Sequence, residues 1–158
     1  MASKNKTRRI IITSIITFVL FFSFYAVYHI NAGMQDAGIE FLRSEARQAM
    51  QHMDGDRVIS LTSNAIQQRP DDHHFLFLRA SGHLMKQDSQ SALSDLDSAI
   101  KISPQTAPYY YVKHQIYLEM NDYQAANIEL KKALELDPDL VNKVKANLHL
   151  VPPHLLAQ

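Results

Sequence analysis

The sequence predicts an all-helical protein in which one N-terminal transmembrane helix precedes a solenoid of helical hairpins. Two observations support this prediction. Three prolines, Pro70, Pro104 and Pro138, stand 34 residues apart, and each follows an alanine by five residues. A fixed period of this length is typical of stacked structural repeats. In addition, residues 10–28 carry no charge and are nearly all apolar or hydroxyl-bearing, long enough for a helix to cross a membrane.

The first element is a basic N-terminus, residues 1–9, followed by a signal anchor at residues 10–30. The apolar stretch exceeds the about 7–15 residues of a cleavable signal peptide, which favours an uncleaved anchor. Four basic residues precede it and the next one is Arg43, so the positive-inside rule predicts a cytoplasmic N-terminus. The four are Lys4, Lys6, Arg8 and Arg9.

Two glycines, Gly33 and Gly38, predict a short flexible linker at residues 31–38. A helical domain is expected after it, at residues 39–151, with repeats at 39–70, 71–104 and 105–138 and a closing amphipathic helix at 139–150. Residues 152–158 form a tail that begins with two prolines. About 120 residues can bury one modest core, so the repeats are expected to form one domain.

The second half of each repeat gives the clearest signature. The segments Asp122–Ala126 and Lys132–Pro138 match it closely, and this pattern resembles the tetratricopeptide repeat family. The resemblance implies helix–turn–helix units in which alanines let helices approach closely and a proline stops the second helix. Residues 39–70 keep the alanines and the proline but lack the tyrosines, so they are interpreted as a degenerate first repeat.

One departure from the family pattern concerns a position where two helices meet. The second repeat has Ala80 there, whereas the third has His114. We expect either a local separation of the helices or an imidazole hydrogen-bonded to a neighbour.

The family resemblance also implies a partner-binding groove lined by the first helices of successive repeats. Its second, fifth, ninth, twelfth and thirteenth positions give the candidate residues His74, Phe77, Ser81, Leu84 and Met85, and Pro108, Tyr111, Gln115, Leu118 and Glu119. The family's clamp for a C-terminal carboxylate has lysine and asparagine at the fifth and ninth positions, which these two repeats lack. An extended or helical apolar segment suits the groove better, with Tyr111 as an anchor; the alternative is that Phe77, Leu84 and Leu118 belong to the core.

Catalytic chemistry finds little support in the sequence. Four glycines form no phosphate loop, and the absence of cysteine excludes thiolate chemistry and zinc–sulfur sites. No two histidines have the i, i+4 spacing of a helical metal site, and Asp95 and Asp97 are interpreted as solvated or salt-bridged surface groups. We expect no enzyme, cofactor, metal or small-molecule substrate. All 16 acidic residues follow the apolar segment, which argues against nucleic-acid binding.

The sequence therefore predicts a membrane-anchored adaptor or scaffold that binds a protein partner through its groove. In a bacterium it would be a single-pass inner-membrane protein with periplasmic repeats. Small anchored repeat proteins resemble assembly factors of envelope complexes, such as those of cytochrome c maturation, pili or secretion systems. Two alternatives stay open: a structural subunit held in a complex by its transmembrane helix, and an organelle receptor with cytosolic repeats.

Overall fold

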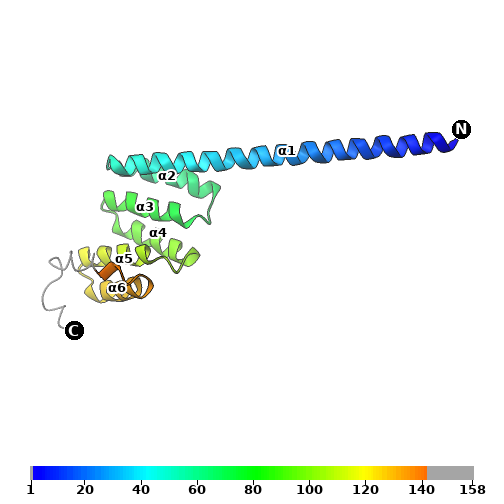
Figure 1. Cartoon of the computed structure of the whole chain (residues 1–158). Coiled ribbons are helices and arrows are strands. Elements are labelled where there is room, and N and C mark those ends of the chain that lie inside the picture. Colours follow the sequence, from blue (N-terminus) through cyan, green and yellow to red (C-terminus); the bar gives the residue numbers. More distant parts are fainter. Residues whose placement is uncertain (1, 142–158) are drawn as a thin grey trace. The chain divides into compact units, whose positions relative to one another are not determined.

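The computed structural model describes residues 2–141, with side chains from Thr17 onward, and this part of the chain forms six α-helices and no strand (Figure 1). The helices are α1 (Ala2–Gln51), α2 (Gly55–Gln68), α3 (His73–Met85), α4 (Ser89–Ile102), α5 (Ala107–Glu119) and α6 (Tyr123–Leu136). The chain divides into two compact units, residues 1–41 and 42–158, and each is described by itself.

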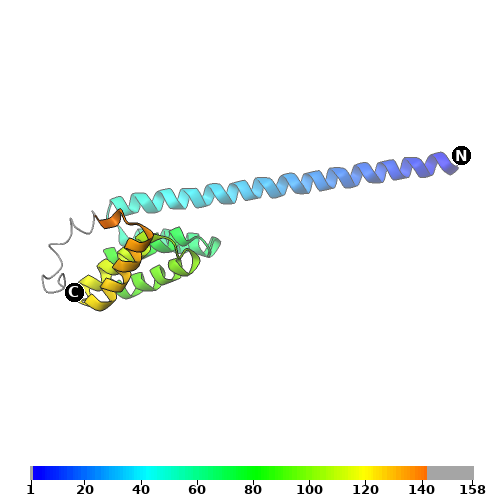
Figure 2. The ribbon, with the colours of Figure 1, turned by 60° about the horizontal axis from the view of Figure 1, so that its bottom comes forward.

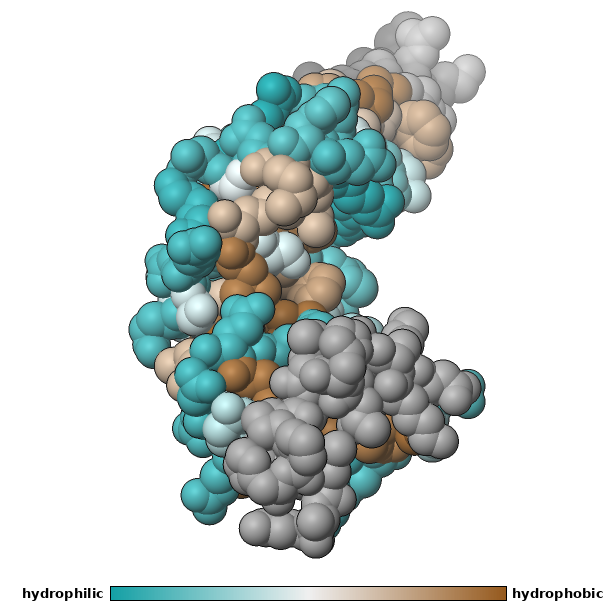
Figure 3. Space-filling model, turned by 90° about the vertical axis from the view of Figure 1, so that its left-hand side faces the viewer, coloured by the Kyte–Doolittle hydropathy of each residue, from teal (hydrophilic) through white to brown (hydrophobic). Residues whose placement is uncertain are grey.

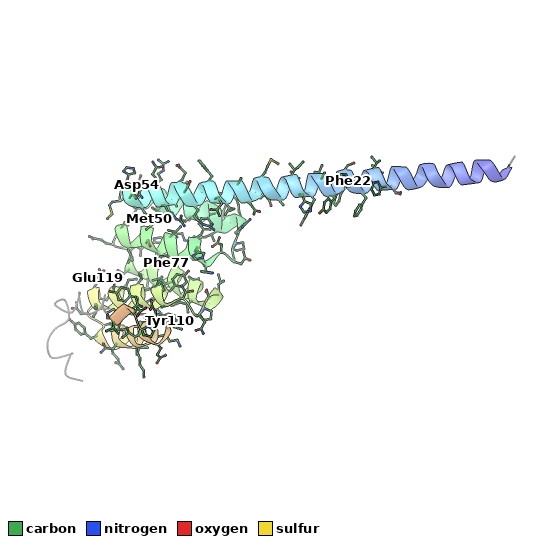
Figure 4. The ribbon with its side chains drawn as sticks, in the orientation of Figure 1. Phe22, Met50, Asp54, Phe77, Tyr110 and Glu119 are labelled. Carbon is green, nitrogen blue, oxygen red and sulfur yellow. The ribbon has the colours of Figure 1, made fainter. Side chains whose placement is uncertain are left out.

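The first unit consists of the long N-terminal part of α1. From Phe18 to Ile30 large apolar side chains are exposed on all sides of this helix, and Phe22, 62% exposed, points away from it in Figure 4. The helix is long and apolar enough to cross a membrane, by length and composition alone. Residues 31–38, predicted as a flexible linker, are helical. A lone glycine costs a helix only about 1 kcal/mol, which the flanking helix formers offset.

In the second unit the helices repeat with the period of the prolines. The helices α2, α4 and α6 have 14 residues each, and each ends two residues before a proline. The helices α3 and α5 have 13 residues each and start 34 residues apart in sequence. Figures 1 and 2 show α3 beside α4 and α5 beside α6, as antiparallel hairpins require. The observed fold is the predicted tetratricopeptide-type solenoid.

Each hairpin turn within a repeat has the same construction. One residue adopts a left-handed backbone conformation, with φ of 56° at Met53, 60° at Gln87 and 60° at Asn121. The aspartate that follows it caps the next helix by accepting a hydrogen bond from a backbone N–H. These aspartates are Asp54, Asp88 and Asp122. Their own N–H groups donate back to the preceding helix over 2.9–3.0 Å, which completes a Schellman-type C-cap.

The core consists of the repeated alanines and the large side chains between them. Ala65, Ala99 and Ala133, the alanines five residues before each proline, are fully buried. They allow close helix packing, and the larger side chains of Leu96 and Ile116 fill the space beside them. Figure 3 shows one face of the molecule, on which brown apolar patches alternate with teal hydrophilic ones.

The contacts between successive repeats differ in extent. The contact of α2 with α3 is extensive, whereas that of α4 with α5 is much smaller. Gly55 and Gly82 permit the first contact: a Cβ atom added to Gly82 would lie 2.9 Å from Cγ1 of Val58 and 3.2 Å from the carbonyl oxygen of Gly55. The backbones of α2 and α3 therefore approach each other more closely than a side chain at Gly55 or Gly82 would allow.

His114 adopts the second of the two predicted arrangements. Its ring is buried between α5 and α6, where Nδ1–H donates to the carbonyl oxygen of Ala126 over 3.0 Å. Burial lowers the pKa of His114, and the hydrogen bond to Ala126 opposes this effect. The predicted closing helix (139–150) and tail (152–158) lie almost entirely outside the described residues, which end at Val141.

Candidate functional site

An open cavity of about 360 Å³ lies between the end of α1 and the start of α3. Its lining residues are Arg43, Arg47, His74, Phe77 and Leu78. Two of these, His74 and Phe77, are among the predicted groove residues. The cavity thus combines cationic side chains with an aromatic and an aliphatic surface.

Arg43 and Arg47 stand one helical turn apart on α1, so their side chains emerge from the same face. Arg43 is largely buried, and its guanidinium donates to the carboxylate of Asp72 over 2.8 Å. Its guanidinium carbon also lies 5.1 Å from the ring centre of Phe75, a cation–π distance. Arg47 is exposed, and no side-chain partner of its guanidinium is found among the described residues. One arginine is therefore fixed in position and the other faces solvent.

Aromatic rings connect the cavity to the next repeat. Phe77 on α3 packs against Tyr109 on α5, with ring centres 5.1 Å apart. The hydroxyl of Tyr109 lies 2.5 Å from Nδ1 of His73, whose pKa is lowered mainly by burial and further by the neighbouring His74. The hydroxyl of Tyr109 and Nδ1 of His73 therefore share one hydrogen bond, and the tautomer of the imidazole sets which of the two atoms donates. This hydrogen bond ties the start of α3 to α5, one residue before His74 of the cavity lining.

The other predicted groove residues on α3 are all partly exposed. Ser81 donates its hydroxyl to the carbonyl oxygen of Phe77 over 3.0 Å. Leu84 and Phe77 pack with part of their surface against the core, so the core interpretation holds for part of each side chain. Met85 ends the helix and is half-buried.

On α5 the predicted positions divide into exposed and half-buried ones. Pro108, Gln115 and Glu119 are exposed, and Glu119 is labelled near the end of α5 in Figure 4. Tyr111 and Leu118 are half-buried, and Tyr111 packs beside the cluster formed by Ala107, Tyr110, Ala133 and Leu140. The three consecutive tyrosines separate as expected: Tyr109 and Tyr110 are buried, and Tyr111 remains accessible.

Two ion pairs inside the repeats were missed by the sequence analysis. Arg79 on α3 donates to both carboxylate oxygens of Asp95 on α4 over 2.6 and 2.8 Å. One period later Lys113 lies 2.6 Å from Glu129 and 2.9 Å from Asp97. These carboxylates raise the pKa of Lys113 even though burial alone would lower it. The prediction of a solvated or salt-bridged surface group was right about the salt bridge of Asp95 but wrong about its exposure, because Asp95 is buried.

The two cavity arginines were also not predicted, although the sequence contains a usable signal. Arg43 and Arg47 stand one period before Phe77 and Ser81, at the fifth and ninth positions of the first repeat. The predicted groove residues come from the two later repeats only. Among the side chains that the structure describes, no group of three or more metal-ligating residues is present.

The comparisons with known proteins agree with the fold. The tetratricopeptide repeat model matches residues 107–140, the third repeat. The TPR domain of Arabidopsis OM64 superimposes with a TM-score of 0.66 at 20% identity, covering 74% of this chain and 96% of that one. The TPR2B domain of yeast Sti1, in a pHsp70 complex, gives 0.63 at 20% identity, covering 72% and 90%.

A third similar structure is an O-GlcNAc transferase of Thermobaculum terrenum, with a TM-score of 0.62 and 26% identity over 66% of this chain. The present chain spans only 20% of that enzyme's length. No match was found among curated proteins. Together, the repeat match and the similar structures support a tetratricopeptide-repeat protein, and such repeats serve protein–protein interaction.

Proposed function

We propose that this chain is a membrane-anchored adaptor that holds a protein partner in the groove formed by α1, α3 and α5. The observation behind this proposal is the cavity at Arg43, Arg47 and Phe77, because it coincides with the register in which tetratricopeptide repeats line a binding surface. Further along the groove, Tyr111 and Leu118 offer accessible apolar surface. The Sti1 domain, which has the same fold, is found in a complex with pHsp70.

The anchor is the apolar part of α1. Its side chains between Phe18 and Ile30 are mostly more than 50% exposed, and in water this surface would be costly at about 25 cal/mol per Å². A lipid environment removes that cost, because the helix satisfies its own backbone groups. We place the basic N-terminus in the cytoplasm and the repeats in the bacterial periplasm, with envelope-complex assembly as the pathway.

The groove is tested by blocking it without removing any buried side chain. Gln115 is exposed on α5 at a groove position, and Gln124 is exposed on α6 outside it. In cells, crosslinking followed by mass spectrometry identifies the partner. Gln115→Trp should then abolish its recovery in mild detergent, whereas Gln124→Trp should leave recovery unchanged. Equal recovery with both variants would refute the groove.

The same experiment distinguishes the adaptor from a subunit held by its membrane helix. Replacing residues 10–30 with an unrelated transmembrane helix should preserve partner recovery if the groove binds the partner. Loss of the complex in this chimera, together with normal recovery of Gln115→Trp, would instead favour the structural subunit.

A further inference from the structure

We infer that the cavity between α1 and α3 recognises an acidic side chain, Asp or Glu, of a partner segment whose next large apolar residue packs toward Tyr111. This inference rests on the proposed groove function and specifies the chemistry of its partner. It starts from the two arginines, which share one face of α1 and open into the same cavity.

The charges in this cavity are not balanced by the described residues. Two like charges four residues apart on a helix repel each other, so a nearby anion is needed to relieve the repulsion. Asp72 supplies one carboxylate, 2.8 Å from Arg43. The guanidinium of Arg47 has no corresponding carboxylate among the described residues, and His74 adds an imidazole to the lining. One further negative charge would therefore complete the site.

The amount of positive charge left without a carboxylate in the cavity favours binding of a carboxylate over a phosphate. Because Asp72 already neutralises Arg43, the site supplies about one positive charge, and a phosphoryl group carries about −1.5 to −2 at neutral pH. A guanidinium also matches a carboxylate with two parallel hydrogen bonds. The pairing with Asp72 and the contact with Phe75 keep Arg43 in a fixed position beside the incoming group.

The apolar part of the cavity determines what accompanies the acidic residue. Phe77 and Leu78 line the same space, and Phe77 contacts Tyr109 on α5, so the cavity adjoins the next repeat. Packed helices are about 8–10 Å apart, and an extended peptide rises about 3.3 Å per residue. The arginines on α1 and Tyr111 on α5 are two helix spacings apart, with α3 between them, so a segment leaving the arginines would meet Tyr111 about five to six residues further on. The expected motif is an acidic residue separated by about four to five residues from an aromatic or aliphatic one.

The probe is an array of random nonapeptides, acetylated and amidated at their ends, incubated with the full-length chain in detergent micelles. We expect enrichment of Asp or Glu about five to six residues from a large apolar residue. For a selected peptide, fluorescence polarisation should show about five- to tenfold weaker binding when its acidic residue is changed to the amide. Arg47→Gln should remove this difference, and Arg47→Glu should reverse the preference toward lysine.

The control is Lys131→Gln, which removes one exposed positive charge from α6 and should leave the acidic preference intact. Peptides bound without an acidic preference, or with one that survives Arg47→Gln, would overturn the inference while leaving the groove function standing. A preference for free C-termini or for phosphoserine would also overturn it. An array with no bound peptide would refute the groove function itself and this inference with it.

Discussion

The close approach of α2 and α3 leads to a quantitative prediction for Gly82→Ala. The added Cβ would lie 2.9 Å from Cγ1 of Val58 and 3.0 Å from Cγ1 of Ile59, whereas carbon atoms are attracted at about 3.5–4.0 Å. Val58 is fully buried and β-branched, so it cannot rotate away, and the carbonyl oxygen of Gly55 belongs to the main chain. The two helices must therefore move apart.

The expected change in the free energy of unfolding combines two opposing effects. Overpacking of this kind costs about 1–3 kcal/mol. Replacing a helical glycine by alanine stabilises the folded state by about 1 kcal/mol. Gly38→Ala isolates the second effect, because a Cβ at Gly38 meets nothing within 4 Å. We therefore expect Gly82→Ala to be less stable than Gly38→Ala by about 1–3 kcal/mol.

Urea unfolding of residues 31–158, followed by circular dichroism, measures this difference. Unchanged slopes of the free energy against urea would show that only stability has changed. If both variants gain the same stability over the wild type, the close contact of α2 with α3 does not exist in solution and the reasoning is refuted.

Three further predictions concern single positions. Protonation of buried His114 is disfavoured in the folded state, so the stability that it contributes is complete above the unfolded pKa of about 6.5 and is lost as pH falls below that value. His114→Ala should flatten the dependence of the urea midpoint on pH between about 7.5 and 5, and an equally steep profile would contradict this assignment. Met53 is 72% exposed in a left-handed conformation, so Met53→Asn should raise the thermal midpoint by an amount equivalent to about 0.5–1 kcal/mol, whereas no change would argue against the turn geometry. Lys113→Met leaves Glu129 without its partner and should cost about 3 kcal/mol, restored in part by also changing Glu129→Leu; a single variant as stable as the wild type would exclude the buried pair.

Membrane topology gives one more test. With the basic residues on the N-terminal side of the apolar segment, alkaline phosphatase fused to the C-terminus should be active in a bacterial host. Green fluorescent protein fused at the same place should be dark. The reverse result would exclude periplasmic repeats.

The sequence predicted the elements whose cause is local and periodic. Pro70, Pro104 and Pro138 predicted where three helices end, and the buried alanines predicted where helices pack closely. The pairing of Arg79 with Asp95 was not predictable in the same way. The two residues are 16 positions apart and meet only because a hairpin folds α4 back on α3, which the i, i+4 rule does not consider.

Local rules also failed at the turns and before the first repeat. Met53 and Gln87 occupy a backbone conformation that usually indicates glycine or asparagine, and only Asn121 gave that signal. The glycines at residues 31–38 suggested a flexible linker, but isolated glycines are tolerated within a long helix. For the candidate site, the family register located His74 and Phe77, and the same register extended to the first repeat gives Arg43 and Arg47, which line the same cavity.

The unequal contacts between repeats have a consequence for how the domain opens. In a solenoid each hairpin is held only by its neighbours, so a weak junction separates units that can unfold independently. The small contact of α4 with α5 is such a junction, whereas α2 and α3 are in close contact. Amide protons of α5 and α6 should therefore exchange with solvent sooner than those of α3. The Tyr111 side of the groove would then adapt to a partner while the arginine side keeps its shape.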